Sequence, residues 1–212
     1  MRLTRSLRIL AAGLIATTAF ATPSQAQFTI GDPLVARSIY DGYAGFILVV
    51  PYSFSPAAYG QAVTSVSIFN GFVGRDFTPL LVANTGPSAW TITGEGTNRV
   101  VGASGLQSYA FGLVSGSDLV TAATRVAWRT SSAGGVIPFD FDSDGNLYRY
   151  SPNGFGPTTA GSAFPEEGAT DRSYAIQFST SAVTATPEPS TVVLTASGLL
   201  AFVGISRRRR SA

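Results

Sequence analysis

Three residue types that carry much of enzyme chemistry are missing from this chain of 212 residues, which has no cysteine, no histidine and no lysine. Without histidine and cysteine, the chain cannot assemble a Ser-His-Asp or Cys-His catalytic set, or a zinc site built from those ligands. Without lysine, it can form neither a Schiff base nor a phosphate-binding loop of the G-x-x-x-x-G-K type. The chemistry that remains for catalysis is that of carboxylates.

Carboxylates suited to catalysis are few. Only three glutamates, Glu95, Glu166 and Glu167, lie between residues 27 and 184. A glycosidase needs two carboxylates about 5 to 9 Å apart, and neighbours in sequence such as Glu166 and Glu167 rarely face one site. Gly94-Glu95-Gly96 lacks the third glycine of a dinucleotide-binding loop, so we interpret it as a turn. The composition therefore favours a noncatalytic protein.

The N-terminus has the three parts of a secretory signal. Arg2, Arg5 and Arg8 make it positive, residues 9–20 are mostly apolar, and Ser24-Gln25-Ala26 places small residues where a signal peptidase reads them. We therefore predict a signal peptide over residues 1–26, cleavage before Gln27 and export of the remainder.

The last twenty-six residues form a second targeting segment. Pro187-Glu188-Pro189 precedes an uncharged stretch of seventeen residues, 190–206, and this is followed by Arg207, Arg208, Arg209 and Arg210. As a helix the stretch is roughly 25 Å long, at the short end of what spans a bilayer core of about 30 Å. The terminal arginines favour a cytoplasmic C-terminus. We predict a single transmembrane helix over residues 190–206; the alternative is a buried core helix followed by a basic tail.

This order of features resembles the PEP-CTERM sorting signal of Gram-negative bacteria. The resemblance covers only the last twenty-six residues, and within them the motif, the apolar segment and the basic end are present in order. It implies that residues 185–212 are a sorting signal, that an exosortase-type membrane enzyme processes the tail, and that the membrane anchor is transient. It also implies a place at the cell surface or in an exopolysaccharide biofilm matrix.

The two targeting segments account for the basic charge of the chain. The whole chain has a formal charge of +2, whereas residues 27–186 contain seven arginines and eleven acidic residues, a formal charge of −4. The high isoelectric point therefore gives no indication of nucleic-acid binding.

Residues 27–184 have the pattern of one all-β domain. Short runs rich in valine, isoleucine, phenylalanine, tyrosine and threonine alternate with glycine, asparagine, proline and serine. This pattern predicts an antiparallel β-sandwich or jelly roll of a size that can bury a core without disulfides. Pro79 suggests that its strand lies at an edge or that it starts a strand, and residues 151–171, which lack periodicity, suggest a long surface loop. The predicted strands are 46–52, 63–69, 78–83, 90–93, 107–114, 119–129, 136–142, 147–150 and 174–184.

One acidic segment has the start of a calcium loop. Asp140, Asp142 and Asp144 alternate along the chain and are followed by Gly145, which permits the sharp turn that such loops need. The twelfth position, which is a bidentate glutamate in an EF-hand, is Ser151, so a complete EF-hand is excluded. These three aspartates are the predicted metal ligands, with calcium as the possible cofactor.

A hairpin is the alternative interpretation of the same segment, because Asp-Gly is a strong hairpin signal. Ile137, Phe139 and Phe141 would then point into the core, and Asp140 and Asp142 would point to water. The two interpretations are compatible, since the tip of a hairpin can hold an ion.

Aromatic residues are numerous for a body with so few charges. We expect Trp90 and Trp128 to be core residues, whereas exposed tyrosines could stack on sugar rings. The sequence therefore predicts an exported, noncatalytic protein of the cell surface or matrix, with polysaccharide as a possible partner. The alternative is a secreted carbohydrate-active enzyme that uses carboxylates on a β-sandwich.

Overall fold

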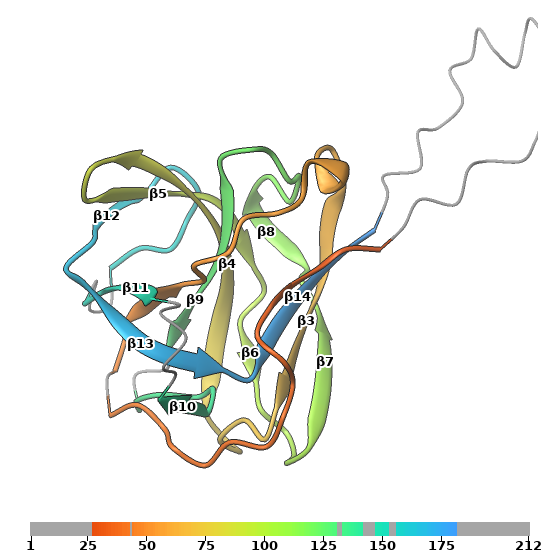
Figure 1. Ribbon diagram of the computed structural model, residues 1–212, viewed down its shortest axis with the longest axis vertical. Helices are drawn as coiled ribbons and strands as arrows, with labels where there is room; N and C mark the ends of the chain where they lie inside the picture. The colour runs from red at the N-terminus through yellow and green to blue at the C-terminus, as the bar shows by residue number, and fades with distance from the viewer. Residues whose placement is uncertain (1–26, 43, 131–132, 142–146, 153–155, 182–212) are drawn as a thin grey trace, which may run out of the picture. The chain divides into compact units, whose positions relative to one another are not determined.

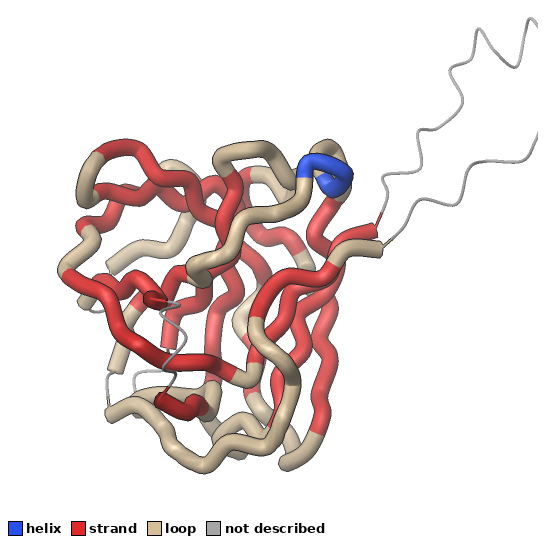
Figure 2. Tube along the Cα trace, in the orientation of Figure 1, coloured by secondary structure: helices blue, strands red, loops and turns tan. Residues whose placement is uncertain are grey.

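The computed structural model describes residues 27–42, 44–130, 133–141, 147–152 and 156–181. In this part of the chain the regular structure is β-strand, apart from a 3-10 turn at Pro56–Ala58 (Figure 2). Each strand pairing in it is antiparallel. The all-β prediction is confirmed, and the antiparallel sheets are consistent with a β-sandwich. The predicted signal peptide (1–26) and sorting signal (185–212) lie outside the described residues.

The smaller sheet joins the first strand of the described chain to the last (Figure 1). Its strand order is β1-β14-β3-β7. Thr29 pairs with Ser179, and the Phe28 and Thr180 main chains are also hydrogen-bonded. The strands are β1 (Thr29–Gly31), β3 (Ala62–Phe69), β7 (Leu106–Ala110) and β14 (Ile176–Ser181).

The larger sheet has the order β10-β13-β11-β2-β9-β4-β5-β12, with β6 paired to β4 and β8 paired to β5. Its strands are β2 (Ile47–Val49), β4 (Asp76–Gly86), β5 (Ala89–Gly96), β6 (Arg99–Val100), β8 (Leu113–Gly116), β9 (Thr124–Thr130), β10 (Phe139–Phe141), β11 (Leu147–Ser151), β12 (Ala163–Pro165) and β13 (Gly168–Tyr174).

The principal core takes side chains from both sheets. Val66 and Phe178 of the smaller sheet belong to the same buried cluster as Leu81 and Trp128 of the larger one. Successive side chains of a strand point to opposite faces, so residues adjacent to the core-facing ones form a second cluster on the other face of the larger sheet. Its members are Ile47, Val49, Leu80, Val82, Trp90, Ile92, Ala127 and Phe164.

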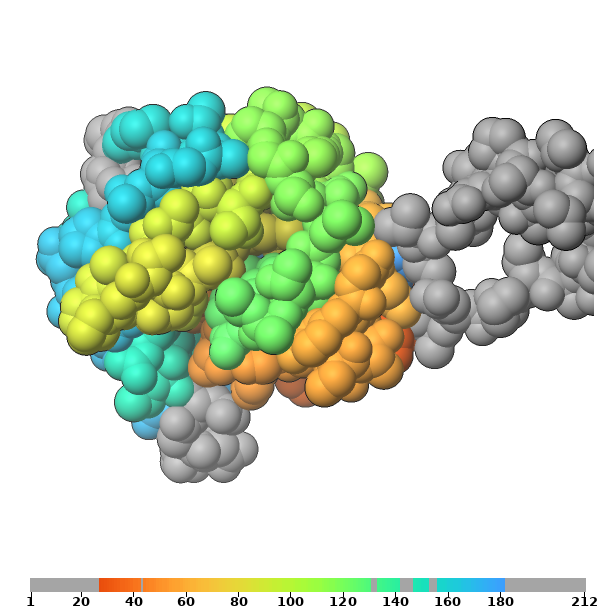
Figure 3. Space-filling view, turned by 90° about the horizontal axis from the view of Figure 1, so that it is seen from above, coloured from red at the N-terminus to blue at the C-terminus, as the bar shows by residue number. Residues whose placement is uncertain are grey.

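The second cluster is associated with the chain that leads into β12. The Gly161 amide donates to the Ile92 carbonyl, and the Ala160 amide donates to the Ser115 hydroxyl. Figure 3 shows the segments around these residues next to one another on one face. Trp90 is 7% exposed and Trp128 is 0% exposed, which confirms the prediction that both tryptophans are core residues.

The predicted hairpin between residues 136–142 and 147–150 is wrong. β10 and β11 do not pair with each other; both pair with β13, at Phe141↔Arg172 and Leu147↔Asp171. Phe141 was expected in the core but is 73% exposed. It lies beyond the end of the core and contacts the ring of buried Phe139 edge-on, with 5.5 Å between ring centroids.

Gly94-Glu95-Gly96 is not a turn, because it lies at the end of β5 and pairs with β8. Two other expectations are also wrong. Residues 151–171 are not one loop, because they include β12 and the first part of β13. Pro79 is not in an edge strand, because it lies in β4, which pairs with β9 on one side and with β5 and β6 on the other. Proline has no N–H to donate, and Pro79 falls between the residues of β4 that pair with β6 and those that pair with β5.

Candidate functional site

The aspartate that follows β1 anchors a buried polar network. Asp32 is 3% exposed. Its carboxylate accepts hydrogen bonds from the Tyr52 hydroxyl at 2.6 Å, the Tyr148 hydroxyl at 2.7 Å and the Tyr174 amide at 2.9 Å. Because a buried charge is tolerated only when its acceptor sites are filled, these three donors explain how an aspartate can lie inside the domain.

A second buried aspartate, Asp41, holds the other end of Tyr174. Its carboxylate accepts a hydrogen bond of 2.5 Å from the Tyr174 hydroxyl and forms an ion pair with Arg172. The same guanidinium donates to the Tyr174 hydroxyl at 3.2 Å and stacks on the Phe139 ring, 4.1 Å from its centroid. Asp32 and Asp41 thus tie the N-terminal segment to β11 and β13.

The electrostatics of this network favour a structural role. Burial raises the pKa of Tyr148 well above its usual value of 10.0, and the Asp32 charge and hydrogen bond add to the effect. Burial and Asp41 likewise raise the pKa of Tyr174. Burial acts to lower the pKa of Arg172, but Tyr174 and Asp41 outweigh it and the pKa rises. Both tyrosines therefore stay neutral donors, and Arg172 stays charged.

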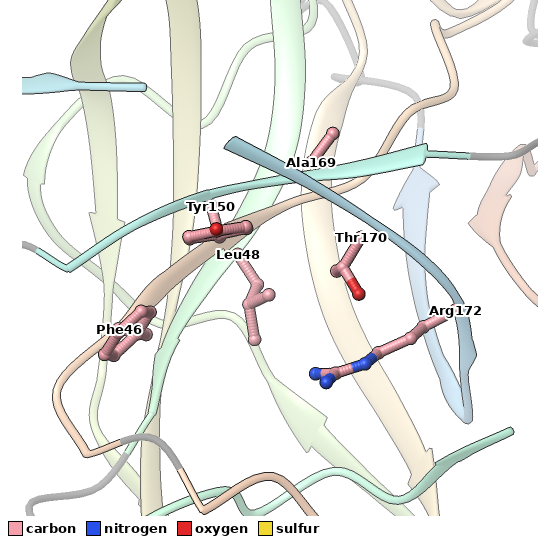
Figure 4. Close-up of a pocket in the computed structure, with 6 residues that line it drawn as sticks. All are labelled: Phe46, Leu48, Tyr150, Ala169, Thr170 and Arg172. Atoms are coloured by element: carbon pink, nitrogen blue, oxygen red, sulfur yellow. The ribbon is translucent and has the colours of Figure 1, made fainter. Parts of the chain in front are cut away.

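A small pocket lies beside the network on the core-facing side of β2 (Figure 4). Its volume is about 130 Å³. The rings of Phe46 and Tyr150, with centroids 6.0 Å apart and planes inclined by 38°, form one part of its wall, and Arg172 lies across from them. The lining residues are Phe46, Leu48, Tyr150, Ala169, Thr170 and Arg172, none of which is a carboxylate.

The predicted calcium ligands are only partly within the described residues. Asp140 lies in β10, and its half-exposed carboxylate is 3.3 Å from the guanidinium of Arg37. Asp142 and Asp144 lie outside the described residues, as do Pro187 to Pro189 and Arg207 to Arg210. No group of three acidic, histidine or cysteine side chains converges within the described part, so calcium binding through all three aspartates stays a prediction.

Two of the three glutamates considered for catalysis, Glu95 and Glu166, are held by different donors. Glu95 accepts hydrogen bonds from Thr158 at 2.6 Å and Ser115 at 3.1 Å. Glu166 accepts one from the Trp90 indole at 2.9 Å and forms an ion pair of 2.9 Å with Arg149. Neither residue lines the pocket.

Sequence reasoning missed Asp32, Asp41, Arg172 and the pocket. Asp32 stands between Gly31 and Pro33, and Asp41 precedes Gly42. Such turn-like settings ordinarily leave an aspartate exposed. Apart from Tyr52, the donors that make burial possible come from residues more than a hundred positions away, Tyr148, Arg172 and Tyr174. The abundance of aromatic residues, among them Tyr148 and Tyr150, was the one signal of this site in the sequence.

Comparison with protein-family models, curated proteins and solved structures found no match for this chain. Within the described ranges, which omit residues 182–212, none of the helices is long and apolar enough to cross a membrane.

Proposed function

We propose that this chain is an exported, noncatalytic protein of the cell surface or extracellular matrix. Residues 1–26 direct export, residues 27–184 form a sandwich or jelly-roll domain, and residues 185–212 are a PEP-CTERM sorting signal. The tail holds the protein in the membrane through residues 190–206 until an exosortase-type enzyme processes it. The order of Pro187-Glu188-Pro189, apolar segment and terminal arginines supports the sorting part of this proposal.

The chemistry of the pocket carries the noncatalytic part. Its wall offers aromatic rings, a threonine hydroxyl and one arginine that is already ion-paired, without a carboxylate. Beside it, the buried aspartates accept bonds from neutral tyrosines. Such a surface suits binding, because acid–base catalysis requires a group that exchanges a proton near the working pH.

Mass spectrometry of the membrane, surface and medium fractions tests export and sorting. We expect the mature protein to begin at Gln27 and a sorted form to lack the segment after Pro189. The variant Glu188→Ala should accumulate in the membrane with its full C-terminus. Glu167→Ala, which removes an exposed carboxylate from the body, should be sorted normally.

Two results would contradict the proposal. Full-length C-termini in every fraction would exclude processing of the tail, and retention of residues 1–26 would exclude the signal peptide. Release of reducing sugars from a polysaccharide by the purified protein, abolished by Glu95→Gln or Glu166→Gln, would instead establish the carbohydrate-active enzyme.

A further inference from the structure

We propose that the pocket between Phe46, Tyr150 and Arg172 binds one sugar ring of a neutral polysaccharide. This inference rests on the proposed function of an exported matrix protein and gives it a ligand class and a site. The pocket volume of about 130 Å³ is below the roughly 300 to 1,000 Å³ of pockets that enclose drug-sized ligands. The site therefore accepts a single ring of a longer chain.

The aromatic wall provides a stacking platform. Tyr150 lies against Gly168, where an added Cβ would be 2.6 Å from the tyrosine oxygen and 2.8 Å from the adjacent ring carbon. Because Gly168 has no side chain, the Tyr150 ring can lie flat along β13 at this position. Figure 4 shows Tyr150 and Phe46 on the same side of the pocket as Leu48. The C–H face of a pyranose can pack on such rings, because an aromatic side chain combines a large apolar surface with specific geometry.

Two hydroxyl groups are available for a sugar. No hydrogen bond joins the Tyr150 or Thr170 hydroxyl to another side chain or carbonyl within the described residues. Figure 4 shows the Thr170 hydroxyl pointing toward the side of the pocket where Arg172 lies. A hydroxyl both donates and accepts, so each of these groups can bind a sugar hydroxyl in either sense.

The charge distribution selects a neutral polymer. The Arg172 guanidinium is ion-paired with Asp41, whose side chain is 2% exposed, so the pocket has no net charge. Residues 27–186 carry a formal charge of −4, and this charge repels a polyanion at low ionic strength. A polyuronate therefore finds no unpaired cation in the pocket, and the domain around the pocket has the same sign of charge as the polymer.

Affinity gel electrophoresis of the purified mature protein in mild detergent tests this proposal. The native gels contain either a neutral polymer, namely dextran, mixed-linkage β-glucan or galactomannan, or the polyuronate alginate. One small pocket implies a weak affinity for each ring, and the repeated units of the polymer raise the apparent affinity. We expect at least one neutral polymer to retard the wild-type protein. Alginate should retard the wild type and Tyr150→Ala equally, because any attraction of alginate to Arg207–Arg210 does not involve the pocket.

Three variants locate the binding. Thr170→Val keeps the shape of the side chain and should weaken retardation about fivefold through the loss of one hydrogen bond. Tyr150→Ala should weaken it about tenfold through the loss of the stacking platform. Tyr59→Ala, which removes a tyrosine that is 41% exposed and outside the pocket, should behave as the wild type does.

The proposal would be overturned if no neutral polymer retards the protein, or if alginate alone does. It would also be overturned if Thr170→Val is retarded as strongly as the wild type, and this test holds even if Tyr150→Ala fails to fold. Each of these results leaves export and sorting untouched, because the fractionation described above measures those separately.

Discussion

Replacement of Asp32 by alanine should cost about 4 kcal/mol of folding stability. The change removes the acceptor of three donors, the Tyr52 and Tyr148 hydroxyls and the Tyr174 amide. Tyr148 is 0% and Tyr174 1% exposed, so two of the donors cannot turn to bulk water. A buried donor left without an acceptor costs about 1 to 3 kcal/mol, and bonds to charged acceptors are at the upper end.

Urea unfolding measures this loss directly. The purified mature protein contains Trp128 in contact with both tyrosine rings, at centroid distances of 5.9 Å from Tyr148 and 5.0 Å from Tyr174. The fluorescence of Trp128 should therefore change when this part of the core opens. A domain of this kind has a total stability of about 5 to 15 kcal/mol, so the expected loss is a large part of it. Asp171→Ala, which removes an exposed aspartate from β13, should change stability by less than about 0.5 kcal/mol.

A double-mutant cycle with Tyr148→Phe separates the hydrogen bond from the rest of the effect. If the Tyr148 hydroxyl is desolvated and bound to Asp32, the two substitutions together should cost less than their sum by about 1 to 3 kcal/mol. A loss below about 1 kcal/mol for Asp32→Ala, or additive effects in the cycle, would refute the view that this carboxylate organises the core.

Three further predictions follow from other features. The pKa values of Tyr148 and Tyr174 are raised in the folded state, so the unfolded chain loses these protons first. Urea unfolding should show nearly constant stability between about pH 7 and pH 9, and above about pH 10 a fall of up to about 2.7 kcal/mol per pH unit, which Tyr148→Phe should halve. Gly31→Ala places a Cβ 2.2 Å from the Ile176 carbonyl oxygen of β14, at a φ of +125°. The melting temperature of this variant should therefore fall by about 5 °C or more. Gly102→Ala, with open space around the added Cβ, should melt as the wild type does. Millimolar calcium should raise the melting temperature of the wild type but not of Asp142→Ala; equal melting curves with and without calcium would exclude a structural ion site.

The strands that could be read from the sequence are those with a clear local pattern. Val63, Val66 and Ile68 of β3 are buried, and the prediction of a strand at 63–69 agrees with Ala62–Phe69. The strand predicted at 119–129 begins only at Thr124. Its alternation continues backward through Ala122 to Val120, but the Thr124 hydroxyl accepts a hydrogen bond from the Thr121 amide and closes a turn there. A local side-chain bond of this kind competes with strand pairing.

The candidate site could not be predicted, because its residues come together only through long-range pairing. Phe46, Tyr150 and Arg172 lie far apart in the sequence and meet because β11 pairs with both β2 and β13. The buried carboxylates have the same origin, since Asp41 is compatible with burial only after β13 has brought Arg172 and Tyr174 beside it. Neither the type of a residue nor its spacing along the chain indicates which distant residue it will contact.

The pairing of the first strand with the last has a consequence for the timing of folding. β14 lies between β1 and β3 in the smaller sheet, so that sheet cannot form until residues 176–181 have been synthesised. Pairing of Thr29 with Ser179 closes almost the whole domain into one loop, and the entropy of closing such a loop must be overcome before the contact stabilises anything. Domains dominated by contacts of this range fold in milliseconds to seconds. A chain whose smaller sheet is completed so late stays incompletely folded during synthesis, a state that suits passage through a translocation channel in the export proposed above.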